Sequence, residues 1–194
     1  DLKDQAGQTI QTTMETFHRF SAEESHSVYV ESIDLYYSSP LTEAGVILVD
    51  TPGADSLNAR HTGVAFEYIK NADAILFVTY YNHAFTQEDR MFLEQLSGVK
   101  DQFSMDKMFF IINASDLASN EEELNQVLKH VESNLEKSEI RNPHMYPISS
   151  IQALAGKQNA DRALLEQSGM ARFEEDWLRF MQDEIAAIAA HSAQ

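Results

Sequence analysis

Short apolar runs separated by amphipathic stretches are the feature of this sequence that most restricts its fold. The runs cover residues 45–50, 74–80, 108–112 and 145–148. A continuous apolar run suits a β-strand that is covered on both faces. Because helical patterns lie between these strands, the sequence predicts an α/β fold with a mostly parallel sheet and helices on both faces.

The helical patterns have apolar residues at a spacing of three and four. They predict helices within residues 1–20, over 62–70, after Thr86, through 124–135 and over 173–188. The fourth helix has two possible capping boxes, Ser119 with Glu122 and Asn120 with Glu123. Residues 27–37 are rich in β-branched and aromatic side chains, which predicts an antiparallel edge strand.

The composition narrows the partners of this chain. Its net charge is −17, from 31 acidic and 14 basic side chains. Nucleic acids and anionic lipids both select clustered Lys and Arg, so we expect neither nucleic-acid binding nor direct docking on such lipid. The sequence has no cysteine and no apolar run of membrane-spanning length. These features favour a cytoplasmic protein.

A first polar motif, Asp50-Thr51-Pro52-Gly53, follows the first apolar run directly. A carboxylate at a strand tip can hold Mg²⁺ or its bound water, and the backbone of a nearby glycine can approach a terminal phosphate. We therefore predict nucleotide binding by Asp50, Thr51 and Gly53, with Asp50 on the metal side. The same letters also suit an ordinary turn.

A second motif, Asn113-Ala114-Ser115-Asp116, follows the run at 108–112. A carboxylate such as Asp116 can accept two hydrogen bonds from the N1–H and exocyclic amine of guanine, which adenine does not offer. The motif predicts guanine recognition by Asn113, Ser115 and Asp116. A turn that leads into a helix cap is the alternative reading.

A third pair, Ser149-Ser150, follows the last short run, where backbone N–H groups could meet the guanine carbonyl. Serine pairs are common at strand ends, so this pair carries weight only with the other two motifs. The carboxyl ends of parallel strands meet at one edge of a sheet. The order of the motifs therefore predicts a single nucleotide pocket at that edge.

The order of DTPG, NASD and SS resembles the dynamin superfamily of large GTPases, most closely its bacterial dynamin-like branch. The stretch ADAILFVTYYNHAFTQEDRMFLEQL resembles the second switch region of that branch and the helix that follows it. The resemblance implies a P-loop-GTPase-like fold that binds GTP or GDP with Mg²⁺. It also implies a cytoplasmic parent protein that hydrolyses GTP, pairs with copies of itself and remodels membranes peripherally, through other domains.

Two features depart from the family pattern. Ala114 stands where GTPases usually have a lysine, and no G-x-x-x-x-G-K-[ST] motif occurs. In the family, the phosphate-binding loop and its strand precede the DTPG, so we expect both upstream of this chain. No catalytic residue is then assigned here, and the isolated chain should be inactive. We expect a partial GTPase domain over 1–168 and a helix leading out of it over 169–194.

A degenerate module that mediates assembly without hydrolysing GTP is the alternative function. Ala114 favours it. The absent strand would lie between the strands that end at Asp50 and near Tyr80, where a gap leaves hydrogen-bonding groups unpaired. We expect the isolated chain to respond to this gap by self-association.

Overall fold

The computed structural model describes residues 7–23, 26, 29–51, 68–69, 71–97, 107–140 and 143–192. The chain divides into two compact units, Asp1–Val49 and Asp50–Gln194. Each unit is described by itself.

The structure describes two short helices of the first unit over their full length. Helix α1 (Met14–Ala22) begins where the hydroxyl of Thr13 accepts the N–H of Thr16. This cap lies well inside the helix predicted for residues 1–20, so the helix starts later than expected. Helix α3 (Pro40–Glu43) is closed by a reciprocal pair of hydrogen bonds between Ser39 and Thr42.

Two predicted strands are absent from the described residues. Residues 29–37 form no strand, and the side chain of Tyr36 is 92% exposed. Residues 45–50 also form no strand, and the side chain of Ile47 is 85% exposed. Both predictions were wrong, because an apolar run becomes a strand only when a neighbour satisfies its backbone N–H and C=O groups.

The second unit is built on a parallel three-stranded sheet in the order β1-β2-β3. The strands are β1 (Ile75–Tyr80), β2 (Met108–Asn113) and β3 (His144–Ile148). Their register aligns Tyr80 with Asn113 and Asn113 with Ile148. This pairing confirms the parallel α/β fold and brings the carboxyl ends of all three strands to one edge.

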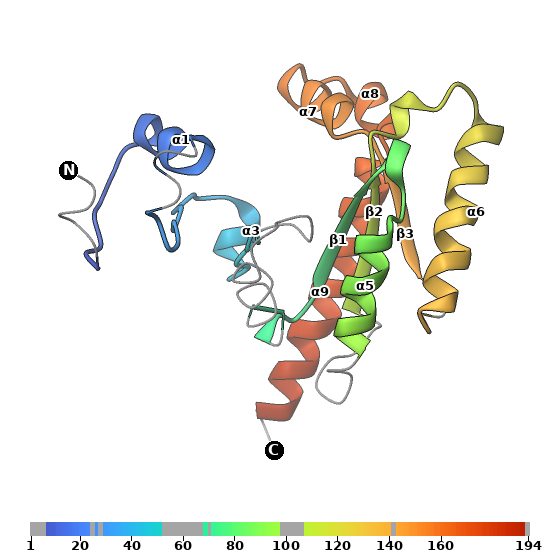
Figure 1. Cartoon of the computed structure of the whole chain (residues 1–194). Coiled ribbons are helices and arrows are strands. Elements are labelled where there is room, and N and C mark those ends of the chain that lie inside the picture. The colour runs from blue at the N-terminus through green and yellow to red at the C-terminus, as the bar shows by residue number, and fades with distance from the viewer. Residues whose placement is uncertain are drawn as a thin grey trace. The chain divides into compact units, whose positions relative to one another are not determined.

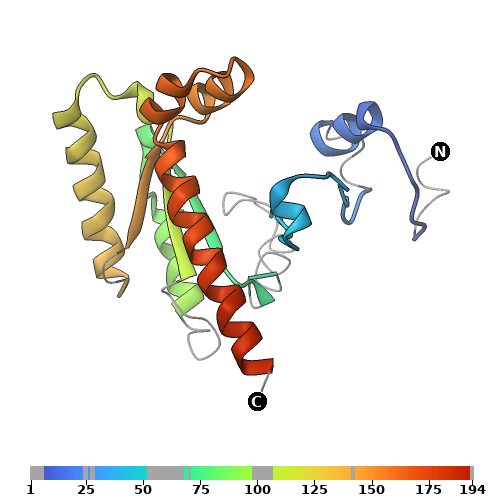
Figure 2. The ribbon, with the colours of Figure 1, turned by 180° about the vertical axis from the view of Figure 1, so that it is seen from behind.

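Helices cover both faces of the sheet, as Figures 1 and 2 show from opposite sides. Helices α5 (Gln87–Ser97) and α6 (Glu121–Lys137) cover one face, and α9 (Met170–Ser192) covers the other. Alternate residues of β2 point to the two faces. One core contains Phe77, Phe110, Ile112, Leu93, Leu96, Val131 and Leu135, and the other contains Phe109, Ile111, Tyr146, Ile148, Phe173 and Trp177.

Local capping explains where the helices begin. The Thr86 hydroxyl accepts the N–H of Asp89, and the Asp89 carboxylate accepts the N–H of Thr86. Of the two capping boxes possible for α6, the structure uses Asn120, whose side chain accepts the N–H of Glu123 at 2.9 Å. Most of the helix predicted over 62–70 lies outside the described residues, although Tyr68 and Ile69 are helical.

The last part of the chain consists of three consecutive helices. They are α7 (Ser150–Gln158), α8 (Arg162–Gln167) and α9, with Ser149 capping α7 and Asp161 capping α8. Lys157 of α7 forms an ion pair with Glu174 of α9. Within the described ranges, no helix combines the length and hydrophobicity needed to cross a bilayer.

Candidate functional site

Three connecting segments meet at the carboxyl edge of the sheet. The 3₁₀ helix η2 (Tyr81–His83) follows β1, the 3₁₀ helix η5 (Ser115–Leu117) follows β2, and α7 follows β3. Helix η5 contacts both β3 and η2. The second and third predicted motifs therefore lie side by side, as parallel strand pairing requires.

Asn113 joins these two motifs. It is the last residue of β2, and its side-chain oxygen Oδ1 accepts two hydrogen bonds from Ser150. The backbone N–H of Ser150 donates at 3.1 Å and its hydroxyl at 2.6 Å. Because the two hydrogen bonds from Ser150 hold Oδ1, they also set the direction of the Nδ2 amino group of Asn113.

Asp116 is presented to solvent by a tight turn. Ala114 adopts a left-handed backbone conformation with φ of 64°, and η5 begins directly after it. The change of direction ends the strand and places Ser115 and Asp116 beyond its tip. Asp116 is exposed and Ser115 is half-buried, so the carboxylate is accessible to a ligand.

Ser149 and Ser150 use their backbone donors inside the protein. The N–H of Ser149 donates to the carbonyl of Ser168 at 2.9 Å, and the N–H of Ser150 donates to Asn113. The Ser149 side chain is buried and accepts the N–H of Gln152. Ile151 follows in the first turn of α7, where backbone N–H groups have no acceptor within the helix. This N–H is the next backbone donor available at the edge.

The first motif is only partly described. Asp50 is exposed and lies in no helix or strand, Thr51 is half-buried, and Gly53 is outside the described residues. Neither Asp50 nor Thr51 belongs to the hydrogen-bonded group around Asn113. Among the described residues, no cluster of three or more His, Asp and Glu side chains could hold a metal ion.

A carboxylate and an adjacent hydroxyl nevertheless suit Mg²⁺. This ion is held in nucleotide sites by one or two protein oxygens, substrate phosphates and water rather than by a full protein cage. The exposed carboxylate of Asp50 and the hydroxyl of Thr51 fit that donor chemistry.

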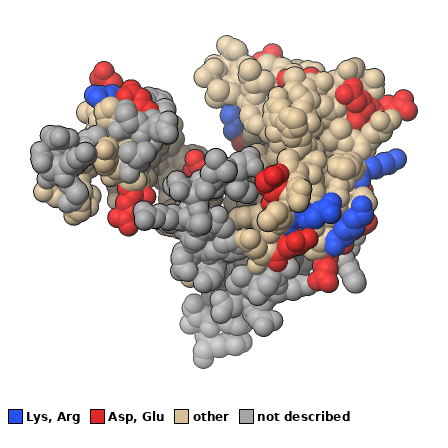
Figure 3. All heavy atoms as spheres, in the orientation of Figure 1, with Lys and Arg blue, Asp and Glu red and all other residues tan. Residues whose placement is uncertain are grey.

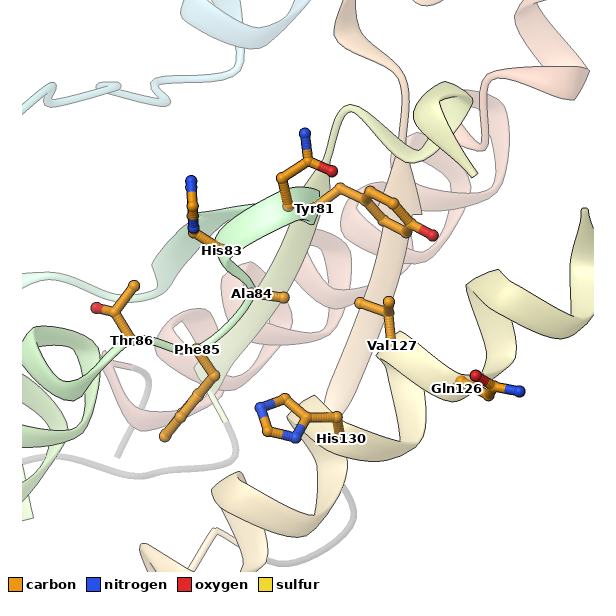
Figure 4. Close-up of a pocket in the computed structure, with 9 residues that line it drawn as sticks. Tyr81, His83, Ala84, Phe85, Thr86, Gln126, Val127 and His130 are labelled. Carbon is orange, nitrogen blue, oxygen red and sulfur yellow. The ribbon is translucent and has the colours of Figure 1, made fainter. Parts of the chain in front are cut away.

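The sequence did not reveal the groove beside η2. It has a volume of about 480 Å³ and lies between η2 with its following loop and one face of α6. Figure 4 shows His83 and Thr86 on one side and Val127 and His130 on the other. Residues 81–86, which line one side of the groove, belong to the stretch that resembles the second switch region, and no motif within them predicts a groove.

Tyr81 closes one end of this groove. Its side chain is 5% exposed, and its hydroxyl has no hydrogen-bond partner among the described residues. Burial raises the pKa of Tyr81, and the nearby carboxylate of Glu123 raises it further. The N–H of Ser119 donates to Glu123 at 3.0 Å and lowers the pKa of that carboxyl group. Tyr81 therefore stays a neutral phenol that packs η2 against α6.

Acidic and basic side chains are mixed on the surface. The net charge is −17, and Figure 3 shows Lys and Arg side chains lying next to acidic ones on the visible face of the second unit. A nucleotide at the sheet edge would thus be held by individual groups rather than by a broad positive field.

Comparison with known proteins identifies the family to which this chain is similar. The model of the Dynamin family matches residues 3–115. Dynamin-like protein A of Bacillus subtilis (strain 168) is 49% identical over 138 residues, which cover 71% of this chain and 12% of that protein. The bacterial dynamin-like protein of Nostoc punctiforme is 28% identical over 170 residues, covering 77% of this chain and 23% of that protein.

A plant protein is also similar. The probable transmembrane GTPase FZO-like, chloroplastic, of Arabidopsis thaliana is 28% identical over 123 residues, covering 63% of this chain and 13% of that protein. This chain thus corresponds to less than a quarter of each of these three relatives. The matched segment includes the first motif, the strands β1 and β2, and the second motif as far as Ser115. The chain belongs to the Dynamin family.

Proposed function

We propose that this chain is the base-reading part of a GTPase domain in a longer dynamin-like protein, which binds and hydrolyses GTP. The observation that carries the proposal is the pair of hydrogen bonds from Ser150 to Asn113. They join the second and third motifs into one group, with the carboxylate of Asp116 exposed beside it. A guanine site requires this combination of a fixed amide and an accessible carboxylate.

Each residue of the group has a distinct role in the proposal. Asp116 accepts hydrogen bonds from N1–H and the exocyclic amine of guanine. The Nδ2 group of Asn113 and the hydroxyl of Ser115 line the pocket around the base. Ser149 and Ser150 hold the β3–α7 loop in place, and the N–H of Ile151 donates to the guanine carbonyl.

Asp50, Thr51 and Gly53 serve the phosphate side. Mg²⁺ bound with GTP supplies charge neutralisation at the phosphates, and Asp50 with Thr51 would hold it. The backbone of Gly53 would come close to the γ-phosphate, since a glycine offers no side chain to prevent the approach. The protein's contribution to phosphoryl transfer is then to position the nucleotide and to hold it in one orientation.

The cradle for the β- and γ-phosphates is not encoded in this sequence, which has no G-x-x-x-x-G-K-[ST] motif. We therefore expect the isolated chain to bind GTP poorly and not to hydrolyse it. The longer protein would be cytoplasmic, would pair through its GTPase domains, and would act peripherally on a membrane through other domains. The names of the relatives, two dynamin-like proteins and a probable transmembrane GTPase, support a dynamin-like GTPase, whereas the cytoplasmic location, the pairing and the peripheral attachment rest on the family resemblance.

Replacement of Asp116 by Ala in the complete natural protein tests the proposal. Loss of two charge-assisted hydrogen bonds should weaken GTP binding by more than about 1 kcal/mol and reduce the preference for GTP over ATP. Titration with fluorescent GTP and ATP in the presence of Mg²⁺ measures both effects.

Glu122→Ala is the matched control, because it removes an exposed carboxylate from the nearby first turn of α6. An unchanged preference for GTP in Asp116→Ala would contradict the guanine assignment. Tight GTP binding by the wild type without turnover would instead support the non-hydrolysing assembly module, the function that Ala114 in place of lysine favours.

A further inference from the structure

The turn between α8 and α9 approaches β3 so closely that only glycine fits. Gly169 has a φ of 78°, in the left-handed region that side chains disfavour. A Cβ atom at this position would overlap the carbonyl oxygen of Pro147 and lie 3.4 Å from its carbonyl carbon. Pro147 is part of β3 and stands two residues before Ser149. Any side chain at 169 would therefore displace the end of this strand.

Ser168 fixes the same turn to the loop that follows β3. Its carbonyl accepts the N–H of Ser149 at 2.9 Å. Its side chain is buried, where the hydroxyl donates to the carbonyl of Leu165 at 2.6 Å and accepts the N–H of Met170 at 3.2 Å. The carbonyl and the hydroxyl of Ser168 are thus both hydrogen-bonded to neighbouring residues. The turn therefore has little freedom to move independently of the loop.

The loop passes this constraint to the second motif. Ser149 caps α7, and Ser150 donates both its N–H and its hydroxyl to Asn113. Three connections therefore link Gly169 to the amide of Asn113. They are the close contact of Gly169 with Pro147, the hydrogen bond from Ser149 to Ser168, and the two hydrogen bonds from Ser150 to Asn113. A shift of Pro147 and Ser149 would therefore change the orientation of Asn113.

We propose that Gly169 is a positioning residue of the guanine site, although it touches no part of the nucleotide. The α8–α9 turn sets the place of the β3–α7 loop, and through Ser150 it sets the amide of Asn113 and the direction of the Ile151 N–H. This inference rests on the proposed function, because it assigns a role in the same site. It predicts that a change behind the loop alters base recognition and not only stability.

The test compares Gly169→Ala with Gly7→Ala in the complete natural protein. Gly7 has a φ of 76°, and a Cβ there would meet nothing within 4 Å, so its variant carries the backbone strain without the close approach. Calorimetry with GTP and 2-aminopurine riboside triphosphate, which lacks the base carbonyl that the Ile151 N–H would meet, gives affinity and the number of binding sites. We expect Gly169→Ala to weaken GTP at least about tenfold and to lower the preference for GTP over this analogue, with the site number unchanged. Gly7→Ala should match the wild type.

A second variant covers the case in which Gly169→Ala does not fold. Ser168→Ala leaves Gly169 in place but removes the hydroxyl that fixes the turn, and it should weaken GTP about threefold or more with the same loss of base preference. Unchanged GTP affinity in the folded variants, or a lower melting temperature alone, would overturn the positioning role while leaving the proposed function intact. Failure of the wild type to bind GTP would overturn both.

Discussion

Ala114 shows how a single backbone conformation shapes the candidate site. The strand β2 ends at Asn113, and the left-handed φ of 64° at Ala114 turns the chain into η5. A Cβ atom is unfavourable in this region by roughly 1 kcal/mol relative to glycine. Ala114 keeps this conformation because Asn113 on one side and η5 on the other are both held by their neighbours.

Ala114→Gly should therefore be tolerated better than Ala118→Gly, an otherwise similar substitution. Ala118 packs against the same core, is also half-buried, and has an ordinary φ of −63°. Both variants lose one methyl group, but only Ala114→Gly relieves backbone strain. We expect Ala114→Gly to be more stable than Ala118→Gly by about 1 kcal/mol in urea unfolding. Equal stabilities would show that the turn at 114 is not strained.

At the residue scale, the sequence indicated which residues gather in the candidate site but not which partners their backbone N–H groups bind. It placed Asn113, Asp116 and the two serines at neighbouring strand ends, and the structure joins Asn113 to Ser150 by two hydrogen bonds. It assigned the backbone N–H groups of Ser149 and Ser150 to the ligand, whereas the structure engages them with Ser168 and Asn113. Partners thirty-seven positions apart, such as Asn113 and Ser150, are set by strand register and leave no local pattern.

Helix α9 holds the second face of the sheet mainly through aromatic side chains. The rings of Trp177 and Phe109 lie 5.1 Å apart at their centroids and meet edge to face, as do Tyr146 and Phe173 at 5.2 Å. Such contacts add to the burial of large apolar surfaces. This packing fixes the start of α9, and with it the turn at Ser168 and Gly169.

Trp177→Ala should remove most of this attachment. The side chain is 8% exposed, so its loss leaves a cavity between α9 and β2, and we expect a destabilisation of about 3–5 kcal/mol. Leu178→Ala is the control, because Leu178 is 49% exposed on the same helix and should cost less than about 1 kcal/mol. Guanidinium unfolding followed by circular dichroism compares the two. A similar cost for both would mean that α9 is not anchored by its aromatic face.

Tyr146 makes the attachment of α9 to the sheet depend on pH. Its hydroxyl donates to Asp176 of α9 at 3.1 Å, and burial, followed by the nearby Asp176 carboxylate, raises the pKa of Tyr146 from 10.0 to about 12. The folded state therefore keeps the proton after the unfolded state has lost it. The stability that this phenol contributes is complete below pH 10 and is lost as the pH rises from 10 to 12.

Tyr146→Phe should make stability fall less steeply over that range. Urea unfolding at several pH values between 9 and 12 measures the slope for the wild type and the variant. Tyr36→Phe, at a phenol that is 92% exposed, is the matched control for loss of a hydroxyl. The same slope in wild type and Tyr146→Phe would rule out this hydroxyl as the source of the alkaline instability.

At the scale of the whole molecule, the most important feature is the outer edge of β1. Within the described part of the second unit, β1 pairs with β2 on one side and has no strand on the other. Leu76, Val78 and Tyr80 are exposed on the face that α9 covers elsewhere. An apolar edge strand with unpaired backbone groups is a template for pairing with another chain.

The isolated 194-residue chain should therefore self-associate. Static light scattering from about 1 to 100 µM should show a mass that rises with concentration. Val78→Lys places a charge on the exposed face of β1 and should lower the association, while Leu154→Lys makes the same change at a similarly exposed site on α7 and should not. A monomer throughout this range would contradict the role given to the β1 edge.

The sequence by itself determined the class of fold and the positions of most elements in the second unit. Strands β1, β2 and β3 and helices α5, α6 and α9 lie where apolar periodicity and capping residues predict them. These signals are local, because a strand core or a helix cap is written within a few consecutive residues. Family membership followed from the same short motifs, and the Dynamin family match confirmed it.

Only the tertiary structure decided which apolar runs become strands and which donors remain for a ligand. The runs at 29–37 and 45–50 have the composition of strands but are exposed and unpaired among the described residues. Likewise, no local pattern reveals that Gly169 packs against Pro147 or that Ser168 takes the N–H of Ser149. Backbone hydrogen bonds between distant segments depend on which partners the whole fold brings within reach, and composition does not encode that geometry.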